Sequence, residues 1–497
     1  MDKLPAELIH AIASHLTPPL AGYATISSTW QHAIESRTFA SVTAYSGVVL
    51  FGQFKAVFAA VRRRTLLRNL AFYARLPLRD EDGIIEEPLT RQEVAEDDVA
   101  YTHALVALFS FLSTWKYEGH ARLTIALRAV TPLPVDDGFG CDFPNYTPEL
   151  SVAMKSLPAV GFSRNALEKS GGLPTVPVVC SFTAGCFGRH LDPAAIPLVA
   201  RALPNIGTMR YAYHPSTRRL PDLRRTERLA LANALSSIAR ADLRLLTMLT
   251  IYCVDEDPFN EAFNPPSLIG PTPSRDHLSV AFRHISQLPC LRHLCLRGYH
   301  VVGSELFEDP GSPVGDSAPT WPALVQLELS ISVITPDGRW YFSGDESNAY
   351  YDDDYDSNPY EVAAWEDVLG EDDSREPRYR FRSTPDSATF TPFIMSLVCA
   401  VARMPVLRKL EFEAPWDCSR PGIRVYYFGA GERRGCDTLS LAEQAFHAAR
   451  LEKSRWVLTL RNYPEAQWLI PPELRAALTR STGEGCVLVT GGAEVVF

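Results

Sequence analysis

The residues that could do chemistry are scattered along this 497-residue chain and match no common catalytic motif. The chain has no Walker phosphate-binding loop, no HExxH zinc motif, no GxSxG nucleophile elbow and no CxxC pair. The nearest approach to a nucleotide-binding loop is Gly429-Ala-Gly431 with Gly435. A dinucleotide fingerprint needs its third glycine three residues after the second, and here it comes four after. We therefore expect a surface loop at this point, and the chain is not expected to be an enzyme.

The ten cysteines and twelve histidines also lack the spacing of a metal site. Cys180, Cys186 and His190 lie close together in the sequence but supply too few ligands for structural zinc. Most cysteines lie in apolar runs, as Cys290 and Cys295 do in LPCLRHLCL, which is typical of buried free thiols in a reducing compartment. We expect no metal and no cofactor, and a location in the cytoplasm, the nucleus or both.

Charged groups offer a different chemistry, the binding of an oppositely charged partner. Residues 345–376 hold thirteen acids and one base, within an acidic insertion at about 343–377. This segment accounts for the net charge of −10, which argues against a protein that coats nucleic acid. A basic cluster enters a predicted helix; it is either a solvated face or a docking surface for an acidic target or for the insertion. Its members are Arg218, Arg219, Arg224, Arg225 and Arg228.

The elements that would position these residues recur along the chain. An amphipathic helix, a short bend and a strand in Leu-x-x-Leu-x-Leu spacing form the unit, most clearly in LPCLRHLCLRGY, WPALVQLELS and MPVLRKLEFEA, with weaker copies in LRLLTMLTIY and LPNIGTMRYAY. Alternation in each strand places the leucines on one face, where only a neighbouring unit can bury them. The pattern predicts an α/β fold with an irregular leucine-rich-repeat-like helix–strand solenoid. The helices expected before most of these strands are 193–202, 226–240, 275–287 and 391–403.

Composition and pattern shifts divide the chain into three parts. We expect a helical module over 1–45, a linker with a degenerate first helix–strand unit over 46–130, and the repeat array with its acidic insertion over 131–497. The Pro- and Gly-rich stretch 131–177 is predicted to be a loop. No apolar run approaches the ~18 residues that span a bilayer, and the first residues, MDKLPAELIHAIASHL, do not have the pattern of a signal peptide.

The N-terminal module carries the most specific pattern. Leu8, Ile9, Ile12 and Leu16 form one stripe of a helix that Pro5 opens. A Pro-Pro pair ends this helix, a weaker second helix follows, and a third is expected after a Ser/Thr cap. This run resembles the F-box motif, which reads LPxEL, then an apolar helix, a short break and a V/I-x-x-x-W pair. The matching residues are Leu4, Pro5, Glu7, Leu8, Ile12, Leu16, Leu20, Ile26 and Trp30.

The resemblance covers about residues 2–41 and implies a three-helix module that docks onto a Skp-type adaptor and, through it, onto the cullin of an SCF ubiquitin ligase. The implied adaptor-binding residues are Leu4, Pro5, Leu8, Ile9, Ile12, Leu16, Leu20, Ile26 and Trp30. An exposed apolar stripe on so small a module is itself typical of a partner site. Gly22 and Ala24 depart from the family, which more often has larger aliphatic residues there.

The function expected from this resemblance is that of an F-box subunit, with the array recruiting an unknown protein substrate and the ligase acting by proximity. The wider pattern looks like the F-box proteins of filamentous fungi. Three other interpretations stay open: a non-ligase interaction scaffold, an enzyme whose site is assembled from scattered residues, and an N-terminus that only caps the solenoid. No membrane or nucleic-acid partner is expected.

Overall fold

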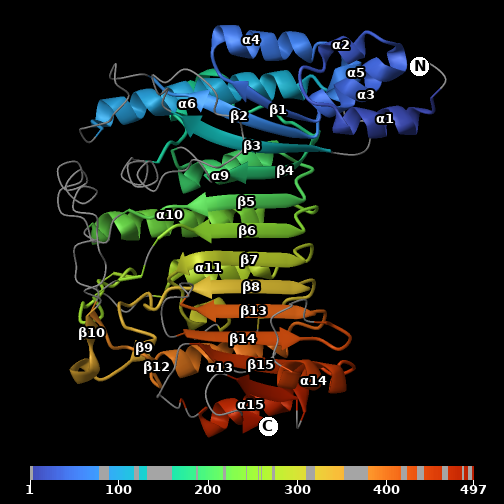
Figure 1. The fold of residues 1–497 in the computed structure, drawn as a ribbon. Helices are drawn as coiled ribbons and strands as arrows, with labels where there is room; N and C mark the ends of the chain where they lie inside the picture. The colour runs from blue at the N-terminus through green and yellow to red at the C-terminus, as the bar shows by residue number, and fades with distance from the viewer. Residues whose placement is uncertain are drawn as a thin grey trace. The chain divides into compact units, whose positions relative to one another are not determined.

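The protein has an α/β fold in which mostly parallel strands are interleaved with helices (Figure 1). The chain divides into two compact units, Met1–Tyr211 and Ala212–Phe497. The boundaries expected at residues 45 and 130 stay predictions from the sequence. The computed structural model describes residues 4–77, 89–116, 122–130, 159–185, 189–216, 220–241, 243–255, 257–258, 260–270, 275–308, 319–351, 379–415, 422–433, 441–461, 468, 470–483, 486–490 and 495–496.

The first unit begins with three short helices, α1 (Ala6–His15), α2 (Ala21–Ala24) and α3 (Ser28–Thr38). Pro5 stands immediately before α1, where its missing N–H costs no helical hydrogen bond. The Ser27 side chain caps α3 by accepting a hydrogen bond from its third residue. The module therefore contains three helices, of which the second, predicted to be the weaker one, is the shortest.

A parallel sheet follows in the first unit. Its strands are neighbours in the order of the sequence, and side chains alternate between a buried and a less buried face, as in β2. The strands are β1 (Ser41–Tyr45), β2 (Asn69–Arg75), β3 (Leu123–Val130), β4 (Val179–Ala184) and β5 (Thr208–Tyr213), whose last two residues belong to the second unit. The connecting helices are α4 (Val48–Val57), α5 (Val61–Arg64), α6 (Arg91–Ser113), α8 (Arg164–Lys169), the 3-10 turn η1 (Pro193–Ala195) and α9 (Ile196–Ala202).

An aromatic cluster joins the helices of the first unit to its sheet. The Phe51 ring in α4 lies 6.0 Å from that of Phe72 in β2 and 6.3 Å from that of Phe111 in α6. Phe54 and Phe58 extend the cluster along α4. Burial of these large apolar side chains stabilises the first unit and leaves the opposite face of β1–β5 for polar residues.

The second unit contains a longer mixed sheet with the strand order β6-β7-β8-β13-β14-β15-β16-β17. Strands β6, β7, β8 and β13 are parallel, and β14 runs antiparallel to both of its neighbours. The strands are β6 (Met248–Cys253), β7 (His293–His300), β8 (Gln326–Ile331), β13 (Lys409–Ala414), β14 (Gly422–Phe428), β15 (Arg455–Arg461), β16 (Val487–Thr490) and β17 (Val495–Val496).

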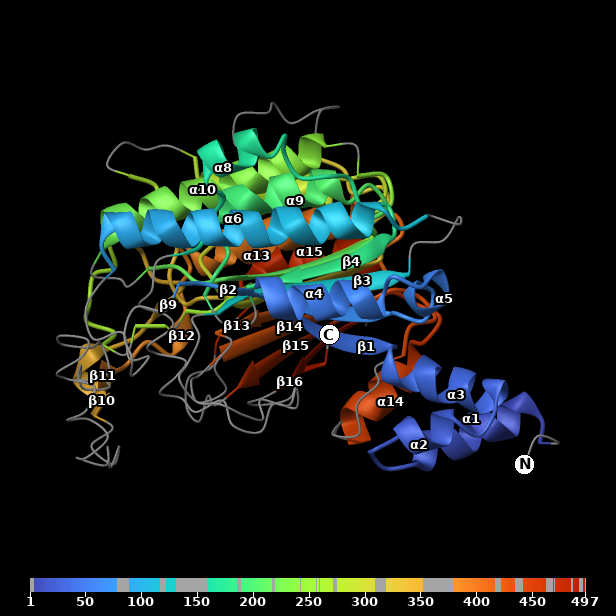
Figure 2. The ribbon, with the colours of Figure 1, turned by 90° about the horizontal axis from the view of Figure 1, so that it is seen from above.

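Helices cover one face of this sheet. Figure 2 shows α10, α13 and α15 on the same side of the strands, whereas α14 packs against the other side near β14–β16, where Phe446 joins Tyr426, Phe428, Val457 and Leu488 in a small core. The helices are α10 (Pro221–Arg240), α11 (His277–Ser286), α13 (Phe390–Val401), α14 (Leu441–Ala449) and α15 (Pro472–Thr482).

The five strands predicted from the leucine spacing are present as β5, β6, β7, β8 and β13. Leu294 and Leu296 of β7 are each 1% exposed, as the alternation predicts. The loop predicted over 131–177 is wrong for α8, which forms because the Ser163 side chain accepts a hydrogen bond from the Ala166 N–H and caps it. Residues 131–158 of that loop lie outside the described residues.

Short elements continue the chain after β8: η3 (Glu346–Asn348), β9 (Phe342–Ser343) paired with β12 (Thr384–Pro385), and β10 (Tyr350–Tyr351) paired with β11 (Tyr379–Arg380). Residues 352–377 of the acidic insertion lie outside the described residues.

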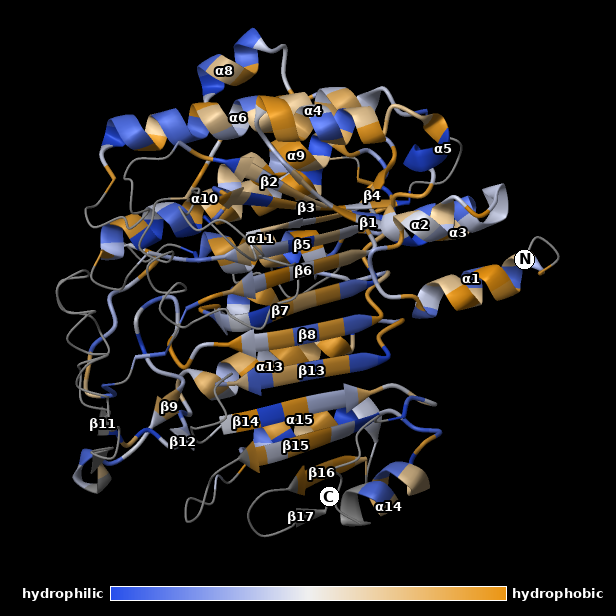
Figure 3. Cartoon of the chain, turned by 45° about the horizontal axis from the view of Figure 1, so that its top comes forward, coloured by the Kyte–Doolittle hydropathy of each residue, from blue (hydrophilic) through white to orange (hydrophobic). Residues whose placement is uncertain are grey.

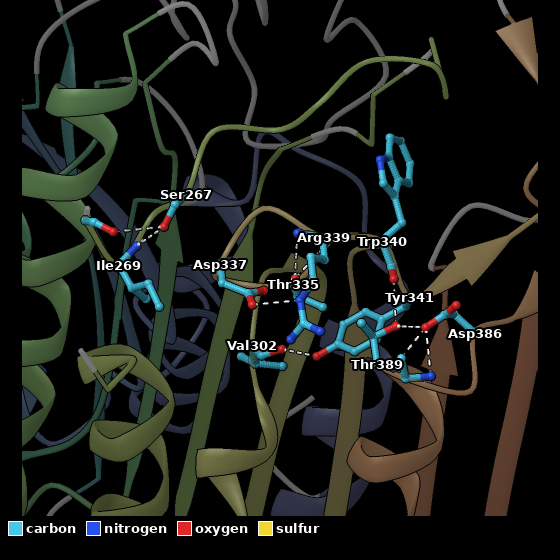
Figure 4. A network of polar contacts seen from close by, with 12 residues as sticks. Ser267, Ile269, Val302, Thr335, Asp337, Arg339, Trp340, Tyr341, Asp386 and Thr389 are labelled. Atoms are coloured by element: carbon cyan, nitrogen blue, oxygen red, sulfur yellow. Dashed lines mark hydrogen bonds and ion pairs between the residues drawn. The ribbon is translucent and has the colours of Figure 1, made fainter. Parts of the chain in front are cut away.

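A polar network holds the segment that follows β8 (Figure 4). The Tyr341 hydroxyl donates to the Val302 carbonyl, and the Thr389 hydroxyl donates to the Trp340 carbonyl at 2.7 Å. Asp386 accepts hydrogen bonds from the Thr389 N–H and hydroxyl at 2.9 and 3.0 Å. These bonds satisfy buried groups of the chain itself, so we assign the network a structural role.

Candidate protein-interaction site

Helix α1 has two faces of different character. Ile9 and Ala13 are 1% and 2% exposed, whereas Leu8 and Ile12 are 51% and 41% exposed. The apolar residues expected on this helix therefore divide into two groups. One group packs against the rest of the module, and the other is exposed to solvent.

The inner side of α1 packs into a core of its own. Ile9 and Ala13 meet Trp30, Ala33 and Ile34 of α3, and Leu16, Leu20 and Ala24 pack around them. The last turn of α1 is held by α3, because the Arg37 guanidinium donates to the carbonyls of Ala13 and Leu16 at 2.5 and 2.6 Å. Ile9 and Trp30, expected as adaptor contacts, are thus also core residues of the module.

The outer side presents large apolar side chains to solvent. Leu4, Leu8, Ile12 and Ile26 are between 40% and 51% exposed, and Tyr23, which sequence reasoning did not select, is 39% exposed. Figure 3 shows the hydrophobic residues of α1 in orange. Tyr23 could have been found from its position three residues before Ile26. We call these five side chains the apolar stripe.

The module is tied to the element that follows the first strand. Glu35 of α3 accepts hydrogen bonds from Arg62 at 2.6 Å and from Arg63 at 3.2 Å, both in α5. Burial raises the pKa of the Glu35 carboxyl, but hydrogen bonds from Gln31 and Arg63 and the charge of Arg62 leave it below its usual value. Only two residues separate α3 from β1, so the three helices continue directly into the sheet.

The basic cluster is not one exposed surface, which corrects the prediction for two of its members. Arg224 and Arg228 are 5% and 7% exposed. Arg224 binds Asp255 at 2.5 Å, and Arg228 binds both carboxylate oxygens of Asp276 at 3.0 and 2.6 Å. Such buried arginines are engaged within the fold and cannot bind a target.

The other members differ from these two. Arg225 is partly exposed, binds Asp222 at 2.5 Å and donates to the Ser267 carbonyl at 2.8 Å. Arg218 and Arg219 lie outside the described residues. The members of the cluster that the structure describes are therefore all paired with a carboxylate.

The face of the second unit's sheet opposite α10, α13 and α15 carries paired charges. Arg297 binds Glu328 at 2.7 Å, and Lys409 binds Glu411 at 3.1 Å. Burial and the Glu328 carboxylate raise the pKa of the Cys295 thiol to about 12, so this thiol is protonated and unreactive. Since these cations already face a carboxylate, the surface is close to neutral.

No group of three metal-ligating side chains occurs among the residues that the structure describes. Cys180 is partly buried and His190 is buried, while Cys186 lies outside the described residues. Gly429 and Gly431 follow β14 in a turn, and Gly435 is likewise not described. In the described part of the chain, no helix is both long and apolar enough to cross a membrane.

No protein-family model matches this chain, and no curated protein matches it. The arrangement of the first unit defines the candidate site by itself: a small helical module with its own core and an exposed apolar stripe, joined to an α/β sheet. The side chains that this site presents to solvent are large and apolar.

Proposed function

We propose that this chain is the substrate-recruiting F-box subunit of an SCF-type ubiquitin ligase. The apolar stripe would bind a Skp-type adaptor and, through it, a cullin, and the α/β array would bind a protein target. The observation that carries the proposal is the division of the motif residues: Ile9 and Trp30 hold the module together, whereas Leu4, Leu8 and Ile12 stay exposed. A module that merely capped the sheet would have no need to expose them.

The order of the strands supports a leucine-rich-repeat-like interpretation of the array. In each unit, successive parallel strands lie beside each other, and helices connect many of them. Such an array is a rigid scaffold that can hold a target near a ubiquitin-loaded enzyme, so that recruitment acts through effective concentration. The chain would then contribute no catalytic residue.

Co-expression with a Skp-type adaptor tests the proposal. The wild-type chain should co-elute with the adaptor, and the variant Leu8→Asp/Ile12→Asp should bind more than about a hundredfold more weakly, because burying unpaired charges costs several kcal/mol. Both positions are exposed, so the variant should fold with an unchanged circular dichroism spectrum and melting temperature.

The matched control is Val61→Asp/Leu245→Asp, which places two charges at other exposed apolar positions, 65% and 51% exposed. This variant should keep the adaptor. A folded wild-type chain that does not co-elute would refute the proposal. Co-elution with the adaptor but never with a cullin would support the adaptor contact and refute the ligase function. The chain would then be a non-ligase scaffold.

A further inference from the structure

The first unit has an apolar pocket between α4 and α6, on the helix side of the sheet, which we call the α4–α6 pocket. It measures about 650 Å³, and its most deeply buried lining residue is Phe72 of β2. Val48 and Val49 line it from the start of α4 and are 95% and 71% exposed. Figure 3 shows much of α4 in the orange of hydrophobic residues. Sites for one small molecule measure about 300–1,000 Å³, so this pocket has the size of such a site.

The pocket exists because α6 presents small side chains to α4. Ala100, Ala104 and Ala107 line it at spacings of four and three residues, which places them on one face of α6. Their methyl groups are too short to fill the space between the two helices. One turn after Ala107 the Phe111 ring does fill it and lies 6.3 Å from the Phe51 ring of α4. Aromatic packing therefore closes the space at Phe111, whereas the alanines leave it open.

The polar part of the pocket is positively charged. The Lys55 Nζ lies 5.2 Å from the centroid of the Phe51 ring, which is itself part of the lining. Within the described part of the chain, Lys55 forms no ion pair. His103 lines the pocket from α6, and no carboxylate is among the lining residues, all of which the structure describes. Arg75 is also a lining residue, but its guanidinium lies over the Tyr45 ring, so we do not count it.

This combination of walls and charge selects one class of ligand. A neutral hydrocarbon would use the apolar walls but not the ammonium group of Lys55. A small polar anion would use the ammonium group but would leave the walls of Phe51, Phe72 and the alanines exposed to water. A molecule with a hydrocarbon chain and one carboxylate complements both, because the chain buries apolar surface and the carboxylate pairs with the lysine.

We propose that the α4–α6 pocket binds a free anionic amphiphile with an unbranched hydrocarbon chain and one carboxylate. The chain lies against Phe51, Phe72 and the alanines of α6, and the carboxylate lies beside Lys55. None of these residues belongs to the apolar stripe, so this site stands without the proposed function.

Isothermal titration calorimetry of the full chain with dodecanoate, below the concentration at which it forms micelles, tests the site. One dodecanoate should bind per chain, and from octanoate to dodecanoate the affinity should rise about fourfold per added methylene. Ala107→Phe fills the pocket from an exposed position and should weaken binding at least about tenfold. The matched control is Ala95→Phe, at an exposed alanine of α6 outside the pocket, which should change affinity less than about twofold.

The contact with the carboxylate is tested by a comparison of decanoate with decanol. Lys55→Gln should weaken the binding of decanoate about threefold to fivefold, since an ion pair at an exposed lysine contributes modestly. It should leave the binding of decanol unchanged, and Lys55→Arg should keep the wild-type affinity for both. The control Lys169→Gln, at an exposed lysine of α8, should alter the binding of neither compound.

Four results would overturn the proposal. They are a folded wild-type chain that does not bind dodecanoate, equal binding by Ala107→Phe, an affinity that does not rise with chain length, and an equal effect of Lys55→Gln on decanoate and decanol. Binding to phosphatidylglycerol vesicles without binding of free dodecanoate would also overturn it, because the partner would then be a membrane. So would a wild-type dimer in sedimentation that Ala107→Phe converts into a monomer, because a second copy would then occupy the pocket.

The same variants separate this site from adaptor binding. Ala107→Phe should still co-elute with the adaptor, and Leu8→Asp/Ile12→Asp should still bind dodecanoate. Loss of adaptor binding with dodecanoate binding retained would refute the ligase function alone. Loss of dodecanoate binding with the adaptor retained would refute the amphiphile site alone.

Discussion

Arg228 and Asp276 form a buried ion pair that organises the second unit. Arg228 binds both carboxylate oxygens of Asp276 and donates to the Val301 carbonyl at 2.6 Å. Burial raises the pKa of the Asp276 carboxyl, but Arg228 and Ser279 together bring it below its usual value. Asp276 also caps α11 by accepting from the Leu278 and Ser279 N–H groups. The arginine is thus needed to keep this capping carboxylate charged.

Replacement of Arg228 by Met should destabilise the protein by about 3–5 kcal/mol, because a buried carboxylate then loses its partner. Urea denaturation followed by circular dichroism measures this change. Arg225→Met, at a partly exposed arginine of the same helix, should cost under about 1 kcal/mol. A loss of stability as small as that of Arg225→Met would show that the Arg228–Asp276 pair is not required for the stability of the fold.

His300 gives the second unit a dependence on pH. Burial lowers its pKa from 6.5 to about 4, and its Nε2 lies 3.1 Å from the Ile251 carbonyl. As pH falls from 6.5 to 4, the unfolded chain takes up a proton that the folded chain does not, so stability falls. Between pH 7 and pH 4.5 the loss from this residue should be about 2–3 kcal/mol.

The variant His300→Gln should remove that part of the pH dependence, which urea titrations at the two pH values measure. His293→Gln, in the same strand but less buried, is the control and should keep the wild-type dependence. An unchanged pH dependence in His300→Gln would mean that folding does not lower the pKa of His300.

At the scale of elements, α3 matters because it joins the N-terminal three-helix module to the sheet. It supplies Trp30 to the module core, and its Glu35 binds Arg62 and Arg63 of α5. Because α3 contacts the module core through Trp30 and α5 through Glu35, it fixes the module relative to the strands of the first unit. The link therefore gives the module a fixed place on the first unit.

Glu35→Ala should loosen this link. We expect a loss of about 1 kcal/mol, because the arginines are partly exposed, and faster amide hydrogen exchange from the end of α3 into β1. Hydrogen exchange with mass spectrometry measures the local effect. Glu168→Ala, an exposed acid on α8, should leave exchange in α3 as it is. Identical exchange for both variants would show that Glu35 does not hold the helix.

At the scale of the whole molecule, the fold gives the described thiols very different exposure to solvent. Cys253 and Cys486 are 5% and 1% exposed, whereas Cys399 on α13 is exposed. Burial, and next the charge of Asp255, raise the pKa of the Cys253 thiol. A buried thiol can react with a reagent only after the structure around it opens, so its labelling rate measures that opening.

Iodoacetamide labelling resolved by mass spectrometry should modify Cys399 more than about a hundredfold faster than Cys253 and Cys486 under native conditions. In unfolding concentrations of urea the three rates should converge. Fast native labelling of Cys253 would show that the end of β6 opens without unfolding of the second unit.

Local patterns in the sequence predicted the helices and strands but not the roles of their polar residues. The leucine spacing located β7 and β8, because alternation is a property of a strand by itself. It could not show that Arg228 is paired, since its partners Asp276 and Val301 lie 48 and 73 residues away. Likewise, the stacking of Tyr45 on Tyr73, with Arg128 over the Tyr73 ring, joins three segments that are far apart in the chain.

The sequence by itself determined the alternation of helices and strands and the presence of an apolar stripe near the N-terminus, because both follow from the short-range period of apolar residues. Only the tertiary structure decided that Ile9 faces Trp30 while Leu8 and Ile12 face solvent, since that choice depends on how α3 packs against α1. Packing also decided that Arg224 and Arg228 are buried and paired with Asp255 and Asp276. Which side chains are buried or paired depends on contacts between segments that are far apart in the chain.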